Sequence, residues 1–212
     1  MKHTKALQPA IVSLFVLCIL FFLNVPYRSI VFSSGIILLY SVLKKGGIKE
    51  FGLIRPSHIG QTVLMAALMA VVLVIGTFYF FHPVLEAMTG NQLNRGPFSQ
   101  LEGNTSFLFV SIIIGWTIGA FMEEIIFRGF FLSRLMILMP GNTGVFAGIA
   151  VTSLLFGYLH DYQGITGQIL TGVIGVFLGG IYVMNQGRLW LNVLVHGFVN
   201  TISMLLLYKG WV

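Results

Sequence analysis

Long apolar runs, separated by short polar connections, dominate the chain. Each run has about the 20 residues that a helix needs to cross a bilayer. The pattern predicts an all-α protein, a polytopic bundle of about seven transmembrane helices, over residues 6–25, 27–43, 59–81, 107–136, 145–160, 165–184 and 189–208. A count from about six to about eight stays open, because the run at 107–136 is long enough to be broken.

The connections between these runs predict the topology. The first, at residues 24–26, is short enough for a tight hairpin. The second, at residues 44–58, is rich in Lys and Arg, and cytoplasmic loops carry an excess of these residues. We therefore expect this connection and the N-terminus in the cytoplasm, and the longest polar stretch, residues 82–106, outside. Apolar side chains within residues 51–54 predict a short piece that lies at the membrane interface.

Composition supports the membrane assignment. Hydrophobic residues make up 57% of the 212 residues and charged residues 8%, against about 25% charged residues in soluble domains. The net charge of +6 arises mostly in the first 55 residues, with no dense basic patch among aromatic side chains, so we expect no nucleic-acid partner. The single Cys18 excludes a disulfide framework and a Cys-rich metal site. Lys2 and Lys5 precede the first run, but the absence of an A-x-A-like cleavage site favours a retained first helix.

Two carboxylates and a guanidinium interrupt the fourth run, at Glu123, Glu124 and Arg128. Each such group at the centre of a membrane helix costs about 2.5–3.5 kcal/mol, so these side chains must face protein or a water-filled cavity. Glu124 and Arg128 are spaced i, i+4 on one face of the helix, and we expect them to pair. Glu123 projects about 100° around the axis from Glu124, which leaves its carboxylate free for chemistry.

Two further polar clusters lie in the second half of the chain. His160, followed by Asp161, ends the fifth run, and a polar stripe at i, i+4 and i+8 follows one face of the last helix, at Asn192, His196 and Asn200. Each cluster alone could serve as hydrogen-bonded packing between helices, and so could the charged pair. Together, a free Glu, two His and an Asn resemble a base, a group that orients it and oxyanion donors.

Helix geometry tests whether these groups can meet. A turn joins the fourth and fifth helices in antiparallel fashion, and Glu123 and His160 both lie about 25–30 Å from it, which brings them level. On the last helix, Asn200 reaches this level better than His196. We expect His196 to need a tilt, or a break in the sixth helix near residues 164–167, to enter the site.

The ionisable groups also predict the organisation of the chain. We expect a single membrane domain over residues 1–212. The polar clusters all lie in its second half, so residues 1–106 are expected to supply three scaffold helices and the external loop. Residues 107–212 would then form the catalytic helix core.

Three ordered motifs resemble those of a known family. They are Glu123-Glu124-x-x-x-Arg128, Phe156-x-x-x-His160 and His196-x-x-x-Asn200. In this order and spacing they resemble the CPBP membrane proteins (CAAX protease and bacteriocin-processing), which include the type II CAAX prenyl endopeptidases. The resemblance covers about residues 107–208, and earlier residues match only in being helical and membrane-embedded.

The resemblance implies an intramembrane endopeptidase. Glu123 and His160 would activate a water for attack on a peptide carbonyl. His196 and Asn200 would form the oxyanion hole, and the Glu124–Arg128 pair would brace the first Glu. The physical chemistry agrees, because a carboxylate in a low-dielectric cavity binds a proton more readily, as a general base must. Each donor aimed at a developing oxyanion contributes about 2.7–4 kcal/mol when water is excluded.

Other readings stay open. Within the protease class, Glu123, His160 and His196 could form a His₂Glu zinc site, although no H-E-x-x-H helix is present and metal-independent hydrolysis is our first expectation. Membrane Glu/His clusters also serve as proton relays, which would suit a proton-coupled transporter. A non-catalytic scaffold or a bacteriocin self-immunity protein could keep the motifs for stability. Asp161 is a candidate hydrogen-bond partner for His160.

The same features predict location and partners. We expect an integral protein of the bacterial cytoplasmic membrane, with a cytoplasmic N-terminus and no cofactor. Its partners would be the lipid bilayer and, as substrate, a membrane peptide or a lipidated protein, prenylated or not. The identity of the substrate, its side of entry and the oligomeric state are left open.

Overall fold

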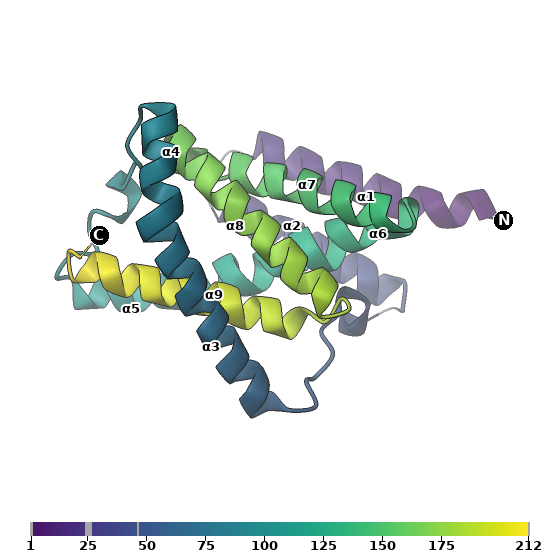
Figure 1. The fold of residues 1–212 in the computed structure, drawn as a ribbon. Helices are drawn as coiled ribbons and strands as arrows, with labels where there is room; N and C mark the ends of the chain where they lie inside the picture. Colours follow the sequence, from purple (N-terminus) through teal and green to yellow (C-terminus); the bar gives the residue numbers. More distant parts are fainter. Residues whose placement is uncertain (1, 24–26, 46, 212) are drawn as a thin grey trace.

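The computed structural model is built of helices (Figure 1). It describes residues 2–23, 27–45 and 47–211, with residues 2–8 described by their backbone alone. Helices account for 82% of the structure, and no strand occurs in the described ranges, which confirms the all-α class. The hairpin expected at residues 24–26 lies outside the described residues.

The α-helices follow one another along the chain as α1 (Lys2–Phe22), α2 (Arg28–Leu43), α3 (Ile59–Gly76), α4 (His82–Thr89), α5 (Thr105–Ile114), α6 (Ser133–Leu138), α7 (Asn142–Tyr158), α8 (Gly164–Met184) and α9 (Leu189–Tyr208). Three π-helical segments extend them, at η2 (Thr77–Phe81), η4 (Gly115–Met122) and η5 (Ile125–Leu132). Short 3₁₀ turns occur at η1 (Ile48–Phe51), η3 (Gly96–Phe98) and η6 (Asp161–Gln163).

The described structure contains seven apolar helical segments, as the sequence predicts. Four are long and apolar enough to cross a membrane, at Ile59–Thr89, Thr105–Leu138, Asp161–Met184 and Leu189–Tyr208. The others are shorter, at Pro9–Phe22, Arg28–Leu43 and Asn142–Tyr158. The helical class is therefore confirmed, while the number of membrane crossings stays a prediction.

The fourth apolar run is one continuous helical stretch, Thr105–Leu138. Instead of a break, its middle is wound as the π-helical segments η4 and η5. Glu123 and Glu124 lie directly between these two segments. π-Helical turns are rare and occur frequently at functional sites. The π-helical winding on both sides of the two glutamates therefore indicates a functional site at this position.

The connection that we expect outside is shorter than predicted, because α4 continues the third helix into it and the loop begins only at Gly90. The loop packs on the turn between α7 and α8. The backbone N–H of Asn94 donates to the Gln163 carbonyl at 3.0 Å, and its side-chain amide donates to the Tyr162 carbonyl at 2.9 Å. This loop therefore lies against the segment that follows His160.

Helices α7 and α8 approach each other closely. A Cβ atom on Gly157 would lie 2.4 Å from the Gln168 carbonyl oxygen and 3.1 Å from the Cα of Gly172, so only glycine fits there. Small residues allow this kind of backbone contact between membrane helices. The contact positions the end of α7, and with it His160, against α8.

Helix α8 is unbroken, and it runs obliquely to α9 in Figure 1. The break that we considered near residues 164–167 does not occur inside this helix. The chain turns instead through η6 and Gly164, the first residue of α8, whose φ is +75°. Inclination of the helices, and not a break, therefore decides which part of α9 meets the glutamates.

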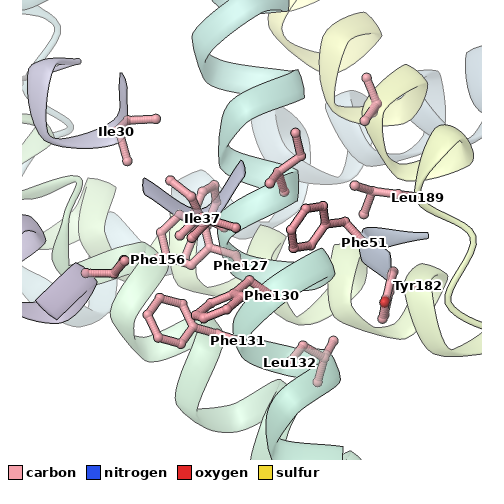
Figure 2. Packing of buried hydrophobic residues seen from close by; sticks show 14 of the residues in the cluster. Ile30, Ile37, Phe51, Phe127, Phe130, Phe131, Leu132, Phe156, Tyr182 and Leu189 are labelled. Atoms are coloured by element: carbon pink, nitrogen blue, oxygen red, sulfur yellow. The ribbon is translucent and has the colours of Figure 1, made fainter. Parts of the chain in front are cut away.

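The larger apolar cluster joins α2, η1, η5, α7 and α9 (Figure 2). The piece expected at the membrane interface contributes to it, because Phe51 is 0% exposed and Leu53 6%, while Ile54 is 46% exposed. The Gly52 carbonyl also accepts a hydrogen bond from the Leu189 N–H at 2.8 Å. Phe51 and Leu53 thus pack against protein at one end of the bundle, and the position of this piece at the membrane interface stays a prediction.

Candidate active site

The carboxylate of Glu124 is the centre of a buried hydrogen-bond network. Its Oε1 accepts from Nη1 of Arg128 at 2.8 Å and lies 3.0 Å from Nδ1 of His196. Its Oε2 accepts from Nδ2 of Asn192 at 3.3 Å. Glu124 is 0% exposed and Arg128 1%. The structure thus places Glu124 and Arg128 in the contact that their spacing predicts.

The same network connects several helices. Nη2 of Arg128 donates to the Gly175 carbonyl of α8 at 3.1 Å, and the guanidinium lies 4.8 Å from the ring centroid of Phe156 in α7. Asn192 of α9 also donates to the Leu178 carbonyl of α8 at 2.7 Å. Buried charges persist in proteins when they are paired and hydrogen-bonded, and this set meets that requirement for Glu124 and Arg128.

Glu123 differs from its neighbour in having an acceptor without a partner. The residue is 7% exposed, and its Oε2 makes no hydrogen bond within the described part of the chain. This oxygen lies 3.9 Å from Nε2 of His196. Buried polar atoms without partners are rare in native structures. Oε2 of Glu123 is therefore an atom that can receive a proton from a bound molecule.

His160 follows the end of α7, where helix carbonyls lack partners in the helix. Its Nδ1 lies 2.7 Å from the Phe156 carbonyl oxygen. Because a carbonyl only accepts, Nδ1 carries the proton and Nε2 of the neutral ring has a free lone pair. Asp161, our candidate partner, is exposed at the start of η6, so the Phe156 carbonyl holds the ring in its place.

His196 is oriented in the same manner. The Glu124 carboxylate is an acceptor, which assigns the proton of the neutral ring to Nδ1. Nε2 is then the nitrogen on the side of Glu123. Two imidazole nitrogens and one carboxylate oxygen, from three separate helical segments, are thus left available as proton acceptors.

His160 lines two cavities. Glu123 and His160 line the first, which has a volume of about 120 Å³. His160 also lines the second, of about 170 Å³, together with His196 and Asn200. A water needs only about 10–15 Å³, so either cavity has room for a water and part of a larger ligand. Tyr27, at the start of α2, also lines the first cavity, so the N-terminal helices supply one of its walls.

Asn200 lies one turn further along α9 than His196. Its Nδ2 donates to the Gly115 carbonyl at 3.1 Å, and a Cβ on Gly119 would lie 3.0 Å from this nitrogen. The expectation that Asn200 would reach the glutamates better than His196 is therefore wrong. The inclined helices bring the middle of α9 to Glu124, and Asn200 opens only onto the second cavity.

No functional role was predicted for Asn192 from the sequence, although its side chain donates a hydrogen bond to Glu124 in the structure. Its i, i+4 spacing from His196 was the available signal, since both side chains share one face of α9. The spacing does not reveal which glutamate this face would meet.

The zinc alternative would use Glu123, His160 and His196 as its ligands. Two imidazole nitrogens and a carboxylate are ligands that zinc accepts. In the described ranges, however, no group of three or more His, Cys, Asp and Glu side chains is placed to hold a metal ion. Metal-independent hydrolysis therefore stays our prediction, with zinc as its alternative.

The fold and the site define a class: an all-helical membrane protein with a buried carboxylate–histidine centre. Residues 105–202 match the family model described as type II CAAX prenyl endopeptidase, Rce1-like. The matched segment is similar to the Rce1-like family, which confirms the resemblance carried by the motifs. Comparison with curated proteins found no match, and neither did comparison with solved structures. The match supports a membrane endopeptidase at family level, and together with the apolar helices it supports an integral membrane protein.

Proposed function

We propose that this protein hydrolyses a peptide bond of a membrane-associated substrate with a water activated by Glu123 and His160. The observation that carries the proposal is the buried Oε2 of Glu123, which has no partner in the described structure and shares a cavity with His160. A general base needs such a free acceptor within reach of the proton that it removes. The family match supports the reaction class.

The first step is attack by water. Oε2 of Glu123 takes one water proton while Nε2 of His160 accepts a hydrogen bond from the other, and the resulting hydroxide bonds to the carbonyl carbon. The carbonyl oxygen becomes an oxyanion in the second cavity. Glu123 then returns its proton to the nitrogen of the leaving amine as the C–N bond breaks, so that no proton is gained or lost overall.

His196 and Asn200 stabilise the oxyanion. Asn200 can donate through its amide, whereas His196 must carry a proton on Nε2 as well as on Nδ1. The doubly protonated ring is positive, and the Glu124 carboxylate at 3.0 Å balances this charge. Glu124 therefore acts through His196, in addition to bracing the site with Arg128. The proposal uses no metal.

The distribution of basic residues supports an orientation. One end of the bundle carries Lys44, Lys45, Lys49, Arg55, Arg134 and Arg188. The other end, which holds the turn after His160 and the loop packed on it, carries Arg28, Arg95 and Lys209. Since basic residues accumulate on the cytoplasmic side, we place the N-terminus in the cytoplasm of a bacterial cell. The active site then lies nearer the outer face, and the substrate enters from there.

The test is a comparison of membrane peptides from cells that contain wild-type or Glu123→Gln protein. Gln keeps the shape of the side chain but removes the proton acceptor, so we expect cleavage products to disappear without loss of the thermal transition in detergent. Glu102→Gln is the matched control, because this Glu is exposed in the loop before α5. Products that persist in Glu123→Gln would overturn the proposal and favour a non-catalytic scaffold.

A further inference from the structure

The second cavity contains a basic residue that the proposed chemistry does not use. Arg95, from the loop between α4 and α5, lines this cavity together with His160, His196 and Asn200. It is exposed, and no Asp or Glu is among the described residues that line the cavity. The opening next to the candidate catalytic groups therefore carries positive charge.

Hydrogen bonds on both sides of Arg95 hold it in place. The side-chain oxygen of Asn94 accepts from the Gly96 N–H at 3.0 Å, and Asn94 itself is bonded to the carbonyls of Tyr162 and Gln163. These carbonyls belong to the turn that directly follows His160. Arg95 is thus attached to the same local structure as the candidate catalytic histidine.

The guanidinium of Arg95 has no ion-pair partner in the described part of the chain. A nearby carboxylate, Glu86, is engaged elsewhere: its Oε1 lies 3.1 Å from Nε2 of His82 and accepts from the Leu93 N–H at 3.0 Å. An unpaired Arg beside a cavity with apolar walls attracts an anionic group of a ligand. Its planar fork fits a carboxylate with two parallel hydrogen bonds.

We propose that Arg95 binds a carboxylate of the peptide substrate, and so selects peptides that carry one near the bond to be cleaved. This inference rests on the proposed function. The carboxylate can be the C-terminal group or the side chain of an Asp or Glu. Arg95 is a specificity residue in this proposal, and it takes no part in activating the water.

The test uses an apolar peptide library made in four forms. The first two forms differ at the C-terminus, which is a free carboxylate in one and an amide in the other. The last two forms are both amidated and carry either Asp or Asn at one internal position. Wild-type protein should cleave the preferred acidic form about 10- to 100-fold better in kcat/KM, as expected for a charge-assisted contact. Arg95→Gln should abolish this preference, mainly through KM, and Arg95→Lys should restore part of it.

Arg28→Gln is the matched control, since this Arg is exposed at the same end of the bundle but lines neither cavity. It should keep the full preference. Equal cleavage of acidic and neutral forms by wild-type protein would overturn the role of Arg95.

Binding of the same peptides to Glu123→Gln protein, by fluorescence anisotropy in detergent, separates the two proposals. If an acidic form binds more tightly than its neutral counterpart, and Arg95→Gln removes this difference, the role of Arg95 is supported. This holds even if wild-type protein cleaves nothing. In that case, the proposed hydrolysis alone fails. Equal binding of all four forms overturns the role of Arg95.

Discussion

Nδ1 of His196 lies 3.0 Å from Oε1 of Glu124, the carboxylate that also binds Arg128. The carboxylate thus connects the charged pair within one helix to the candidate oxyanion donor on another. Glu124 was expected to brace Glu123 together with Arg128. In this structure it also orients the histidine beside Glu123, so its removal should affect stability and turnover together.

The Glu124–Arg128 pair should be essential for stability. Breaking a buried pair strands the remaining charge, at a cost of about 3–5 kcal/mol. We expect Glu124→Gln and Arg128→Leu each to lower the thermal transition in detergent. The double variant should recover part of the loss, because no uncompensated charge remains. Strictly additive losses would show that the two side chains are not coupled.

Two asparagines on one face of α9 should behave differently. Asn200→Ala removes a donor near the second cavity, so we expect turnover to fall about 10²–10³-fold, with a smaller loss of stability than in Asn192→Ala because Asn200 is only half-buried. Asn192→Ala leaves the Leu178 carbonyl and Oε2 of Glu124 without this donor, which should cost about 1–3 kcal/mol of stability. Steady-state kinetics and melting of the purified variants measure both. A large loss of stability in Asn200→Ala, with turnover kept, would contradict its role.

Removal of metal should leave activity unchanged. We expect protein that has been treated with chelator, and checked by elemental analysis, to cleave its peptide at the untreated rate. The reason is that Glu123 and His160 supply the proton acceptors without an ion. Activity that disappears with the metal and returns with zinc would make Glu123 a ligand, or a partner of one.

The orientation can be tested with introduced cysteines in a background that lacks Cys18, the single cysteine of the chain. A membrane-impermeant thiol reagent added to intact cells should label Asn91→Cys and leave Lys49→Cys unlabelled. The basis is the excess of basic residues at the end that carries Lys49. The reverse labelling would place the active site at the cytoplasmic face.

Acid should weaken the end of the bundle that carries η1. Partial burial by itself raises the pKa of the Glu50 carboxyl. Hydrogen bonds from Arg134 and Ser41, and the positive charges of Arg134 and Lys44, outweigh the effect of burial, so the pKa of Glu50 is lowered below its ordinary value of 4.5. The stabilisation is therefore present above pH 4.5 and is lost as the pH falls through the lower pKa of the folded protein.

Glu50→Gln should lower the thermal transition by roughly 2–4 °C at neutral pH and remove this part of the acid dependence. Melting curves of wild-type and variant protein between neutral and acidic pH measure the difference. Curves that stay parallel down to low pH would contradict the role of Glu50.

The sequence by itself determined the helices and the contacts within them. Apolar runs of spanning length mark helices because backbone groups in lipid must bond within their own segment. The contact of Glu124 with Arg128 follows equally from the sequence, since the fixed rise and rotation of a helix bring residues i and i+4 together. Such relations need no knowledge of neighbouring helices.

Contacts between helices were decided only by the tertiary structure. Counting residues from the turns favoured Asn200 over His196, and the inclination of α8 and α9 reversed that order. The π-helical winding around Glu123, the burial of Phe51 and the place of Arg95 beside the second cavity also lay beyond the sequence pattern. Rise per residue gives a position along one axis, whereas tilt, rotation and loop docking depend on side-chain packing between segments far apart in the chain.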